Sequence, residues 1–328
     1  MNTLSRHHAL SPAAPAAGIS DTPASSLTGT PFVRFNLNNM PELLWWIEQH
    51  LDQKLTTDSL AAVTGYSPRH VFSLFRRTTG HTPADHIRLR KLTLAANLLR
   101  HTRRAITDIA NMYAFSTVQA FTRTFSHHFG QSPRAYRQAN RWDMGQLYPS
   151  TLIKPTLSYQ YQRCPVRHCF FTEEHGDVTR LNYGFNLLLM ADNARITNMS
   201  DIQAHYTRLL SRYAGPGTAF SVLWDIRTDT PGCDATIHAF AGQLSTVAAT
   251  PFARSIAGNY ACFTATGTFR DIIEFMAWIR GNGLHRHHNI VKRGPVLSCF
   301  SPTATAGLWQ MKHCVPVTDC DSASPRPG

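Results

Sequence analysis

The 328-residue chain is predicted to contain an all-α domain with two helix-turn-helix subdomains joined by a long helix, followed by an α+β domain. Three observations support this prediction. One helix near residue 70 carries start and stop signals, and its pattern recurs further along the chain. After residue 141 the pattern changes to short segments that alternate in hydrophobicity like strands.

The first of these helices is expected over residues 67–80. Ser67 can cap its N-terminus, Pro68 fits the first helical position, and Gly80 can take the left-handed conformation that ends a helix. An apolar stripe for burial is formed by Val71, Leu74 and Phe75. The opposite face is basic and polar, which suits the major groove of DNA but is also typical of a solvated surface.

The pattern then repeats. Shorter helices are expected over residues 41–51 and 56–65, and Leu60–Ser67 matches Ile109–Ser116 at an offset of 49. Phe75, Gly80 and Pro83 match Phe125, Gly130 and Pro133 at an offset of 50. We therefore expect one extra residue in the second helix of the second copy, which would shift its outward residues slightly in register.

A long helix is predicted between the two copies. It begins at Pro83 after the cap Thr82 and continues to Arg100, a span of roughly 26 Å at 1.5 Å per residue. Its surface is expected to carry the basic residues Arg88, Arg90, Lys91 and Arg100. Successive major-groove segments lie about 34 Å apart, so one monomer could fill two of them on an asymmetric site.

Charge is concentrated on this part of the chain. Residues 41–141 hold 14 Lys+Arg against six Asp+Glu, whereas residues 142–328 hold 16 against 13. This asymmetry is typical of a polyanion-binding domain. The chain has no run of 18 apolar residues and no signal-peptide pattern at its start, and its seven cysteines include no Cys-x-x-Cys. We expect a cytoplasmic, nucleoid-associated protein with reduced thiols and no membrane partner.

The remaining segments set the expected domain limits: a disordered tail at 1–35, the DNA-binding domain at 36–141, a linker at 142–156, the second domain at 157–318 and a tail at 319–328. Strands in the second domain are expected over residues 165–171, 220–226, 236–243, 260–266 and 308–317. Helices are expected over residues 200–210 and 271–280.

A family signature runs through the second helix-turn-helix copy. Its residues are Ala110, Phe115, Phe121, Arg123, Phe125, Gly130, Pro133, Tyr136 and Arg137. With Glu48–Asp52 and Thr79–His81, it resembles the AraC/XylS transcription regulators, in the branch that contains MarA, SoxS and Rob. The order of elements after residue 157, with Tyr260–Gly267 and Cys314–Val317, resembles a GyrI-like effector-binding domain, as in the Rob-like layout.

This resemblance implies a transcriptional regulator, most simply an activator, with double-stranded DNA and RNA polymerase as partners. The DNA-contacting residues that it implies are Arg69, His70, Ser73 and Arg76 in the first copy and Thr117, Gln119, Ala120 and Arg123 in the second. Phe72 stands at a family contact position and cannot form a hydrogen bond, so the branch's target sequence is not expected to transfer.

The resemblance also implies a ligand site in the second domain. Trp224, Tyr260 and Phe263 could line a cleft, although such residues are more often part of the core. Lys312 stands where GyrI-like pockets often have a Glu. Either the pocket takes a small neutral or anionic effector and binds lipophilic cations weakly, or it has lost ligand binding. An exposed strand lysine is an equally simple interpretation.

Two alternatives come from other classes of protein. Cys164, between Arg163 and His168, could accept a methyl group or act in an enzyme if a nearby cation lowered its pKa. The second domain could instead sequester a small molecule. We expect no cofactor, no catalytic residues and no metal, because the pairs His127-His128 and His287-His288 lack metal-ligand spacing.

Overall fold

A computed structural model of the chain describes residues 40–167, 169–181, 199–215, 217–228, 235–245 and 255–318. The two segments predicted to be tails, residues 1–35 and 319–328, lie outside these ranges. In the described part of the chain, no helix has both the length and the apolar character needed to cross a membrane.

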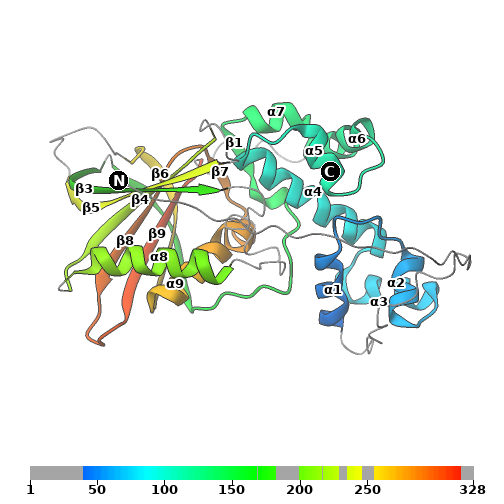
Figure 1. The fold of residues 1–328 in the computed structure, drawn as a ribbon, viewed down its shortest axis with the longest axis horizontal. Helices are drawn as coiled ribbons and strands as arrows, with labels where there is room; N and C mark the ends of the chain where they lie inside the picture. Colours follow the sequence, from blue (N-terminus) through cyan, green and yellow to red (C-terminus); the bar gives the residue numbers. More distant parts are fainter. Residues whose placement is uncertain are drawn as a thin grey trace, which may run out of the picture. The chain divides into compact units, whose positions relative to one another are not determined.

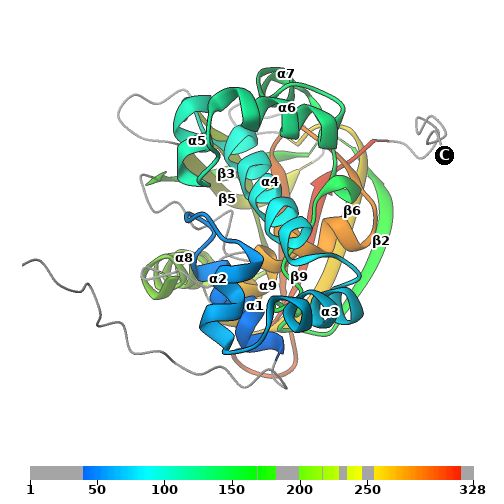
Figure 2. The same cartoon turned by 90° about the vertical axis from the view of Figure 1, so that its right-hand side faces the viewer.

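The first part of the described chain is helical, as predicted (Figure 1). Its helices are α1 (Met40–Gln49), α2 (Thr57–Thr64), α3 (Pro68–Thr79), α4 (Pro83–His101), α5 (Ile106–Met112), α6 (Val118–Phe129) and α7 (Pro133–Gln138). Figure 2 shows α4 running between the group α1–α3 and the group α5–α7. The long helix therefore joins the two helix-turn-helix units.

Ser or Thr side chains cap the N-termini of α2, α3, α4, α6 and α7, and glycines end several of the helices. Ser67 accepts a hydrogen bond from the backbone N–H of His70 at 3.3 Å, and Thr82 accepts one from that of Asp85 at 3.1 Å. Such caps stabilise a helix by about 1 kcal/mol each. Gly80 ends α3 with φ of 76°, a left-handed conformation that favours glycine. The end signals seen in the sequence are confirmed.

Buried apolar side chains hold both helix-turn-helix units together and belong to one continuous cluster. The predicted stripe of α3 is buried, and Val71 and Phe75 have no exposed surface. In the second unit the core is aromatic, and the ring centroids of Phe125 and Tyr136 lie 5.3 Å apart in an edge-to-face arrangement. Burial of these side chains orients the opposite faces of α3 and α6 toward solvent.

The second part of the described chain is an α+β domain. Its strands are β2 (Tyr159–Val166), β3 (Phe170–Leu181), β4 (Phe220–Arg227), β5 (Ala235–Ser245), β6 (Gly258–Gly267), β8 (Val296–Pro302) and β9 (Trp309–Pro316). They form one antiparallel sheet in the order β2-β6-β9-β8-β4-β5-β3. Its helices are α8 (Met199–Ala214), α9 (Phe269–Trp278) and α10 (Leu284–Arg286), with a π-helical turn at Ile279–Gly283.

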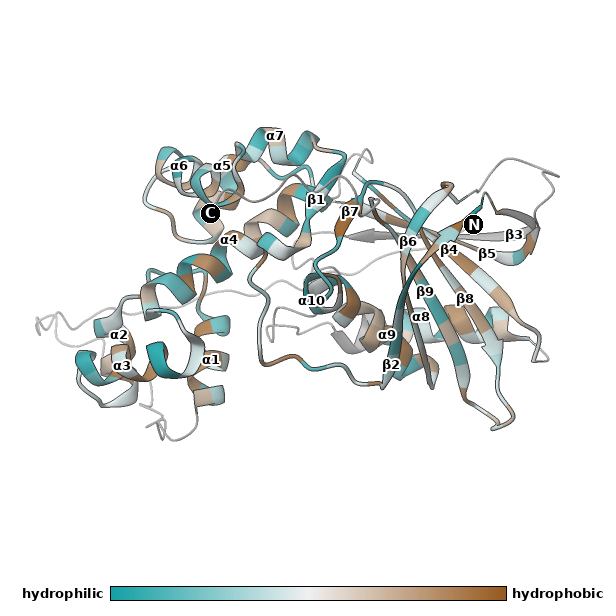
Figure 3. Ribbon diagram, turned by 180° about the vertical axis from the view of Figure 1, so that it is seen from behind, coloured by the Kyte–Doolittle hydropathy of each residue, from teal (hydrophilic) through white to brown (hydrophobic). Residues whose placement is uncertain are grey.

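Six of the seven strands form two β-α-β-β halves, and β2 adds an edge strand beside β6. One half is β3-α8-β4-β5 and the other is β6-α9-β8-β9, and they meet where β4 pairs with β8. Helices α8 and α9 lie side by side on one face of the sheet (Figure 1), where Phe269 of α9 stacks on Trp309 of β9 at 5.2 Å. Figure 3 shows hydrophobic and hydrophilic stretches alternating along the strands. Successive residues of a strand point to opposite faces of the sheet, so that every second residue shares a face.

Several expected elements need correction. The strand expected over residues 165–171 is wrong, because β2 ends at Val166 and β3 begins at Phe170. Pro165 is tolerated inside β2 because this strand is an edge of the sheet, where proline removes no ladder hydrogen bond that the sheet needs. Strand β8 was not anticipated, whereas the expected helix over residues 200–210 and the strands over 220–226 and 236–243 are confirmed.

The segment expected to be a linker begins with ordered structure. Strand β1 (Arg141–Asp143) pairs antiparallel with β7 (Ile290–Lys292), with Trp142 opposite Val291. A 3-10 turn (Met144–Gln146) follows, and the backbone N–H of Met144 donates to the carbonyl of Asn289 at 2.9 Å. The chain leaving α7 is thus attached to the second domain by a strand pair and by backbone hydrogen bonds.

Candidate nucleic-acid interface

The outward face of α3 carries the first set of predicted DNA contacts. Arg69, His70, Ser73 and Arg76 are all exposed, as is Phe72, whose ring is 46% exposed. His70 stacks on Tyr66 with ring centroids 4.9 Å apart, which holds the imidazole at the start of the helix. Arg76 donates from Nη1 to the carbonyl of Gly80 at 3.4 Å, so this guanidinium also contacts the end of its own helix.

The outward face of α6 carries the second set. Gln119 and Arg123 are exposed and Ala120 is half-buried. Thr117 is the N-cap, and its hydroxyl accepts a hydrogen bond from the backbone N–H of Ala120 at 3.0 Å. The backbone N–H groups at a helix N-terminus also favour a phosphate. Arg123 stands one turn further along the helix, with its guanidinium available to the solvent.

The two recognition helices match residue for residue, which corrects the expected register shift. Helices α3 and α6 both contain 12 residues, and their caps Ser67/Thr117 and Gly80/Gly130 are each 50 positions apart. The extra residue lies in the turn before α6. Ser116 and Thr117 could both serve as caps, and the helix uses Thr117. Arg69, His70 and Ser73 thus correspond in position to Gln119, Ala120 and Arg123.

The turn before α6 also shows a strained residue. In the first copy Gly65 ends α2 with φ of 76°, and the matching residue of the second copy is Ala114, with φ of 53°. The left-handed region costs a non-glycine residue about 1–2 kcal/mol. This conformation directs the chain from α5 into α6 despite the missing glycine.

Comparisons with known proteins agree with this geometry. A family model described as a helix-turn-helix domain matches residues 60–139. The transcriptional regulator Rob of Salmonella typhimurium is 44% identical over 108 residues, which make up 33% of this chain and 37% of Rob. The regulatory protein SoxS of Escherichia coli is 42% identical over 96 residues, which are 29% of this chain and 90% of SoxS.

The chain belongs to the AraC family of helix-turn-helix transcriptional regulators. A solved regulator from Chromobacterium violaceum with an AraC-type DNA-binding domain is also similar, at 29% identity and a TM-score of 0.29, covering 31% of this chain and 95% of that one. The relatives that the AraC-family chain matches are regulators rather than enzymes. The chain matches only 37% of the length of Rob, and the helix-turn-helix model matches residues 60–139.

Part of the positive charge of this AraC-family domain is buried, which corrects the expected basic surface of α4. Arg90 has no exposed surface and forms a bidentate ion pair with Glu48, with Nε–Oε1 at 2.6 Å and Nη2–Oε2 at 3.0 Å. Lys91 is also buried and donates to the carbonyl of Gln53 at 2.7 Å. Burial lowers the pKa of Lys91 to about 8, opposed by the negative charge of Asp52. These two cations stabilise the fold and are not presented to DNA.

The expected ligand residues do not meet in one cleft. Trp224 and Phe263 point to the sheet face that carries α8 and α9, where Trp224 donates from Nε1 to Ser298 Oγ at 2.9 Å. Tyr260 is on the opposite face, and its hydroxyl donates to the carbonyl of Ile256 at 2.6 Å. Lys312 lies opposite Thr264 and so shares the face of Tyr260. Strand alternation, which puts residues 260 and 263 on opposite faces, separates the set.

Cysteines gather on that second face. Cys262 Sγ lies 2.8 Å from Cys164 Sγ and 3.2 Å from Cys314 Sγ. Burial and the hydrogen bond with Cys262 raise the pKa of the Cys164 thiol to about 11, although Lys312 opposes this. Arg163 points to the other face and donates to Asn289 Oδ1 at 3.1 Å, and His168 lies outside the described residues. A thiol with a raised pKa is a poor nucleophile, so no observation favours the methyl-acceptor alternative.

In the described ranges, no group of three or more His, Cys, Asp or Glu is placed to hold a metal ion. The cysteine contacts were not visible in the sequence, because they depend on the register of β2, β6 and β9. The alternation of β6 and β9 was visible, but the limits of β2 and its pairing with β6, nearly a hundred residues away, were not.

Proposed function

We propose that this AraC-family protein is a sequence-specific transcription regulator that binds duplex DNA as a monomer. In this proposal α3 and α6 enter two successive major grooves, and the site is asymmetric. The observation that carries it is the pair of recognition helices of equal length and matched caps within one chain. They flank α4, whose 19 residues span roughly 28 Å at 1.5 Å per residue.

The exposed side chains favour different roles for the two helices. Arg123 and Gln119 on α6 have the chemistry for bidentate contacts to guanine and adenine. On α3, Arg69 and His70 can reach base edges or phosphates, and the exposed ring of Phe72 suits an apolar contact with a thymine methyl group. The two half-sites are therefore expected to differ in sequence, which favours a non-palindromic site.

Salt-dependent binding to promoter fragments tests the proposal. Arg123→Ala should weaken binding by about tenfold to a hundredfold, the effect of losing a base or phosphate contact of about 1–3 kcal/mol. Arg212→Ala is the matched control, because it removes the same charge from an exposed position on α8. Equal losses in the two variants, or no binding to genomic fragments at low salt, would contradict the proposal.

Stoichiometry tests the monomer. Analytical ultracentrifugation of the complex should show one protein on each duplex. A complex that contains only two proteins per duplex would rule out the monomeric arrangement, even if Arg123 proves essential. Activation through RNA polymerase, which we infer from the regulators this chain resembles, is tested by transcription in vitro from a bound promoter with and without the protein.

We further propose that residues 157–318 form an effector-binding domain of GyrI-like type, joined through residues 142–156 to a DNA-binding domain at residues 36–141. The two β-α-β-β halves of the sheet support this part of the proposal. Lys312 on the face opposite the helices favours a neutral or anionic effector. Calorimetry with a cationic dye should show weak binding by the native chain and stronger binding by Lys312→Glu, and tight binding by the native chain would contradict it.

A further inference from the structure

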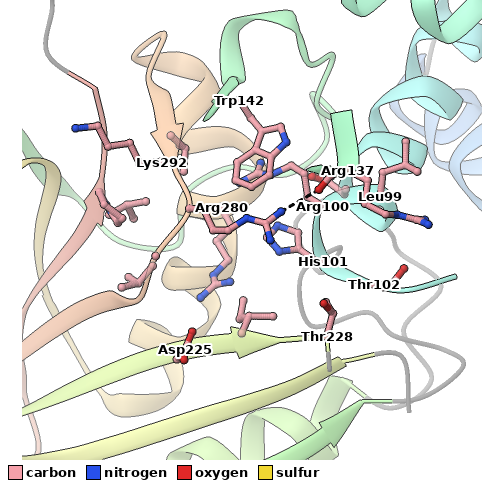
Figure 4. Close-up of a pocket in the computed structure, with 18 of the residues that line it drawn as sticks. Leu99, Arg100, His101, Thr102, Arg137, Trp142, Asp225, Thr228, Arg280 and Lys292 are labelled. Carbon is pink, nitrogen blue, oxygen red and sulfur yellow. Dashed lines mark hydrogen bonds between the residues drawn. The ribbon is translucent and has the colours of Figure 1, made fainter. Parts of the chain in front are cut away.

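A cavity of about 680 Å³ lies where the end of α4, the segment from Arg137 to Trp142 and the second domain meet (Figure 4). Volumes of this size are typical of small-molecule sites. Arg100 and His101 reach it from α4, Arg280 from the turn after α9, and Lys292 from β7. It is lined by residues of both parts of the chain and is separate from the face that carries Lys312.

The lining of this cavity is strongly cationic. Its Lys and Arg side chains are Arg100, Arg103, Arg137, Arg280, Lys292 and Arg293. The carboxylate among the lining residues, Asp225, already pairs with Arg227, with Nε and Oδ2 2.7 Å apart. The cavity therefore holds a large excess of positive charge.

Burial and neighbouring positive charges lower the pKa values of the cationic groups in this cavity. Burial lowers the pKa of Arg280 to about 10, Tyr206 opposes this, and the nearby charge of Arg100 lowers it further. The pKa of His101 lies well below its usual range, because of burial and then of Arg100, Arg280 and Arg293. Like charges in a partly desolvated space repel, and an anion between them would remove that repulsion.

Two guanidinium groups of the lining are incompletely hydrogen-bonded. In the part of the chain that the structure describes, the Nε atoms of Arg100 and Arg137 are buried without a hydrogen-bond partner. Nη1 of Arg100 contacts Met144 Sδ at 3.1 Å, and a thioether is only a weak acceptor. A buried donor left without a strong acceptor costs free energy.

Trp142 holds two of the guanidinium groups in place. The guanidinium carbon of Arg100 lies 4.6 Å from the centre of the indole ring and that of Arg293 lies 5.4 Å from it. The indole N–H donates to the carbonyl of Tyr136 at 2.9 Å, which orients the ring. The cationic groups are thus preorganised on a buried aromatic side chain.

We propose that this cavity binds a small anion with two or more negative charges, of the carboxylate or phosphate type. The planar guanidinium forks match both oxyanion geometries, and the charge of the lining exceeds what one monovalent ion would balance. The bound anion contacts α4 and the second domain at once and stabilises their attachment to each other. This site goes beyond the proposed DNA-binding function and does not depend on it.

The site can be tested on the full chain by calorimetry and by thermal unfolding. Both are carried out at constant ionic strength with citrate, with inorganic pyrophosphate, and with acetate as the monovalent control. The two polyvalent probes distinguish a carboxylate site from a phosphate site. We expect saturable one-to-one binding of at least one of them and a rise in melting temperature. Arg280→Gln, which keeps a polar side chain of similar length, should weaken that binding by about ten- to a hundredfold, the effect of one charge-assisted hydrogen bond.

Matched variants separate this proposal from the previous one. Arg212→Gln should leave anion binding unchanged, and Arg123→Ala should lose DNA affinity but keep anion binding. Equal binding of acetate and citrate, equal losses in Arg280→Gln and Arg212→Gln, or no saturable binding would overturn the anion site. If DNA displaces citrate and Arg280→Gln loses affinity for both alike, the cavity is part of the DNA surface and the proposal is wrong. Should Arg280→Gln not fold, Arg100→Gln tests the same cavity.

Discussion

The buried ion pair of α1 and α4 offers the sharpest test of how this fold uses its charges. Arg90→Ala would leave the Glu48 carboxylate, which is 3% exposed, without the guanidinium that contacts both of its oxygens. Removing one partner of a buried pair costs about 3–5 kcal/mol, because the remaining charge stays desolvated. We therefore expect the free energy of unfolding of the helical domain to fall by this amount.

Arg88→Ala is the matched control, two residues away on the same helix. Arg88 pairs with Asp85 at 2.8 Å, but their side chains are 40% and 43% exposed, so the loss should stay below about 1 kcal/mol. Urea denaturation of the full chain, followed by circular dichroism at a helical wavelength, measures both variants. Replacing both Glu48 and Arg90 by hydrophobic residues should recover most of the stability. If Arg90→Ala cost no more than Arg88→Ala, the argument from burial would be refuted.

Three further predictions concern single positions. Gly65→Ala should lower the free energy of unfolding by about 1–2 kcal/mol, whereas Ala114→Gly should raise it by up to about 1 kcal/mol, because both residues have positive φ. Urea denaturation that showed changes of the opposite sign would contradict the left-handed conformation of these two residues. Because the pKa of Cys164 is raised to about 11, this thiol should react with iodoacetamide at neutral pH on the order of a hundredfold more slowly than a free thiol, and the rate should rise with pH. Rapid labelling of Cys164 at neutral pH, detected by mass spectrometry, would contradict this prediction. Burial, and secondly the charge of Arg280, lower the pKa of His313 to about 3 in the folded chain. Between about pH 6.5 and pH 3 this imidazole therefore binds a proton in the unfolded chain but not in the folded one, so the free energy of unfolding falls as the pH drops. His313→Gln should reduce that slope by up to about 1.4 kcal/mol per pH unit, and an unchanged slope would assign the effect to other groups.

The helix-turn-helix part was largely predictable because its signals are local. Ser67, Gly80, Thr82 and Gly130 act on the backbone within one turn of helix, so their effect can be inferred without knowing the rest of the fold. The choice between Ser116 and Thr117 as the cap of α6 could not be made this way. Both side chains can accept the capping hydrogen bond, and in the structure Thr117 accepts it.

The sheet was only partly predictable because its contacts are distant in sequence. Alternation identified β4, β5, β6 and β9, but nothing local in Val296–Pro302 distinguished β8 from a loop. The pairing of Cys262 with Cys314 depends on the register of two strands about fifty residues apart. A shift of one residue in that register would move every side chain to the other face.

By itself the sequence determined the helix limits, the apolar stripe of α3, the repeat and the family, because each depends on neighbours along the chain or on a long signature. Only the tertiary structure decided which charges remain available. Arg90 and Lys91 look like surface residues of α4, yet Glu48 and the carbonyl of Gln53 draw them into the core. Arg100 and Arg280, 180 positions apart, meet in a cationic cavity because β1 pairs with β7 and joins the two parts of the chain. The burial of a charge depends on what packs against it, and the local sequence does not contain that information.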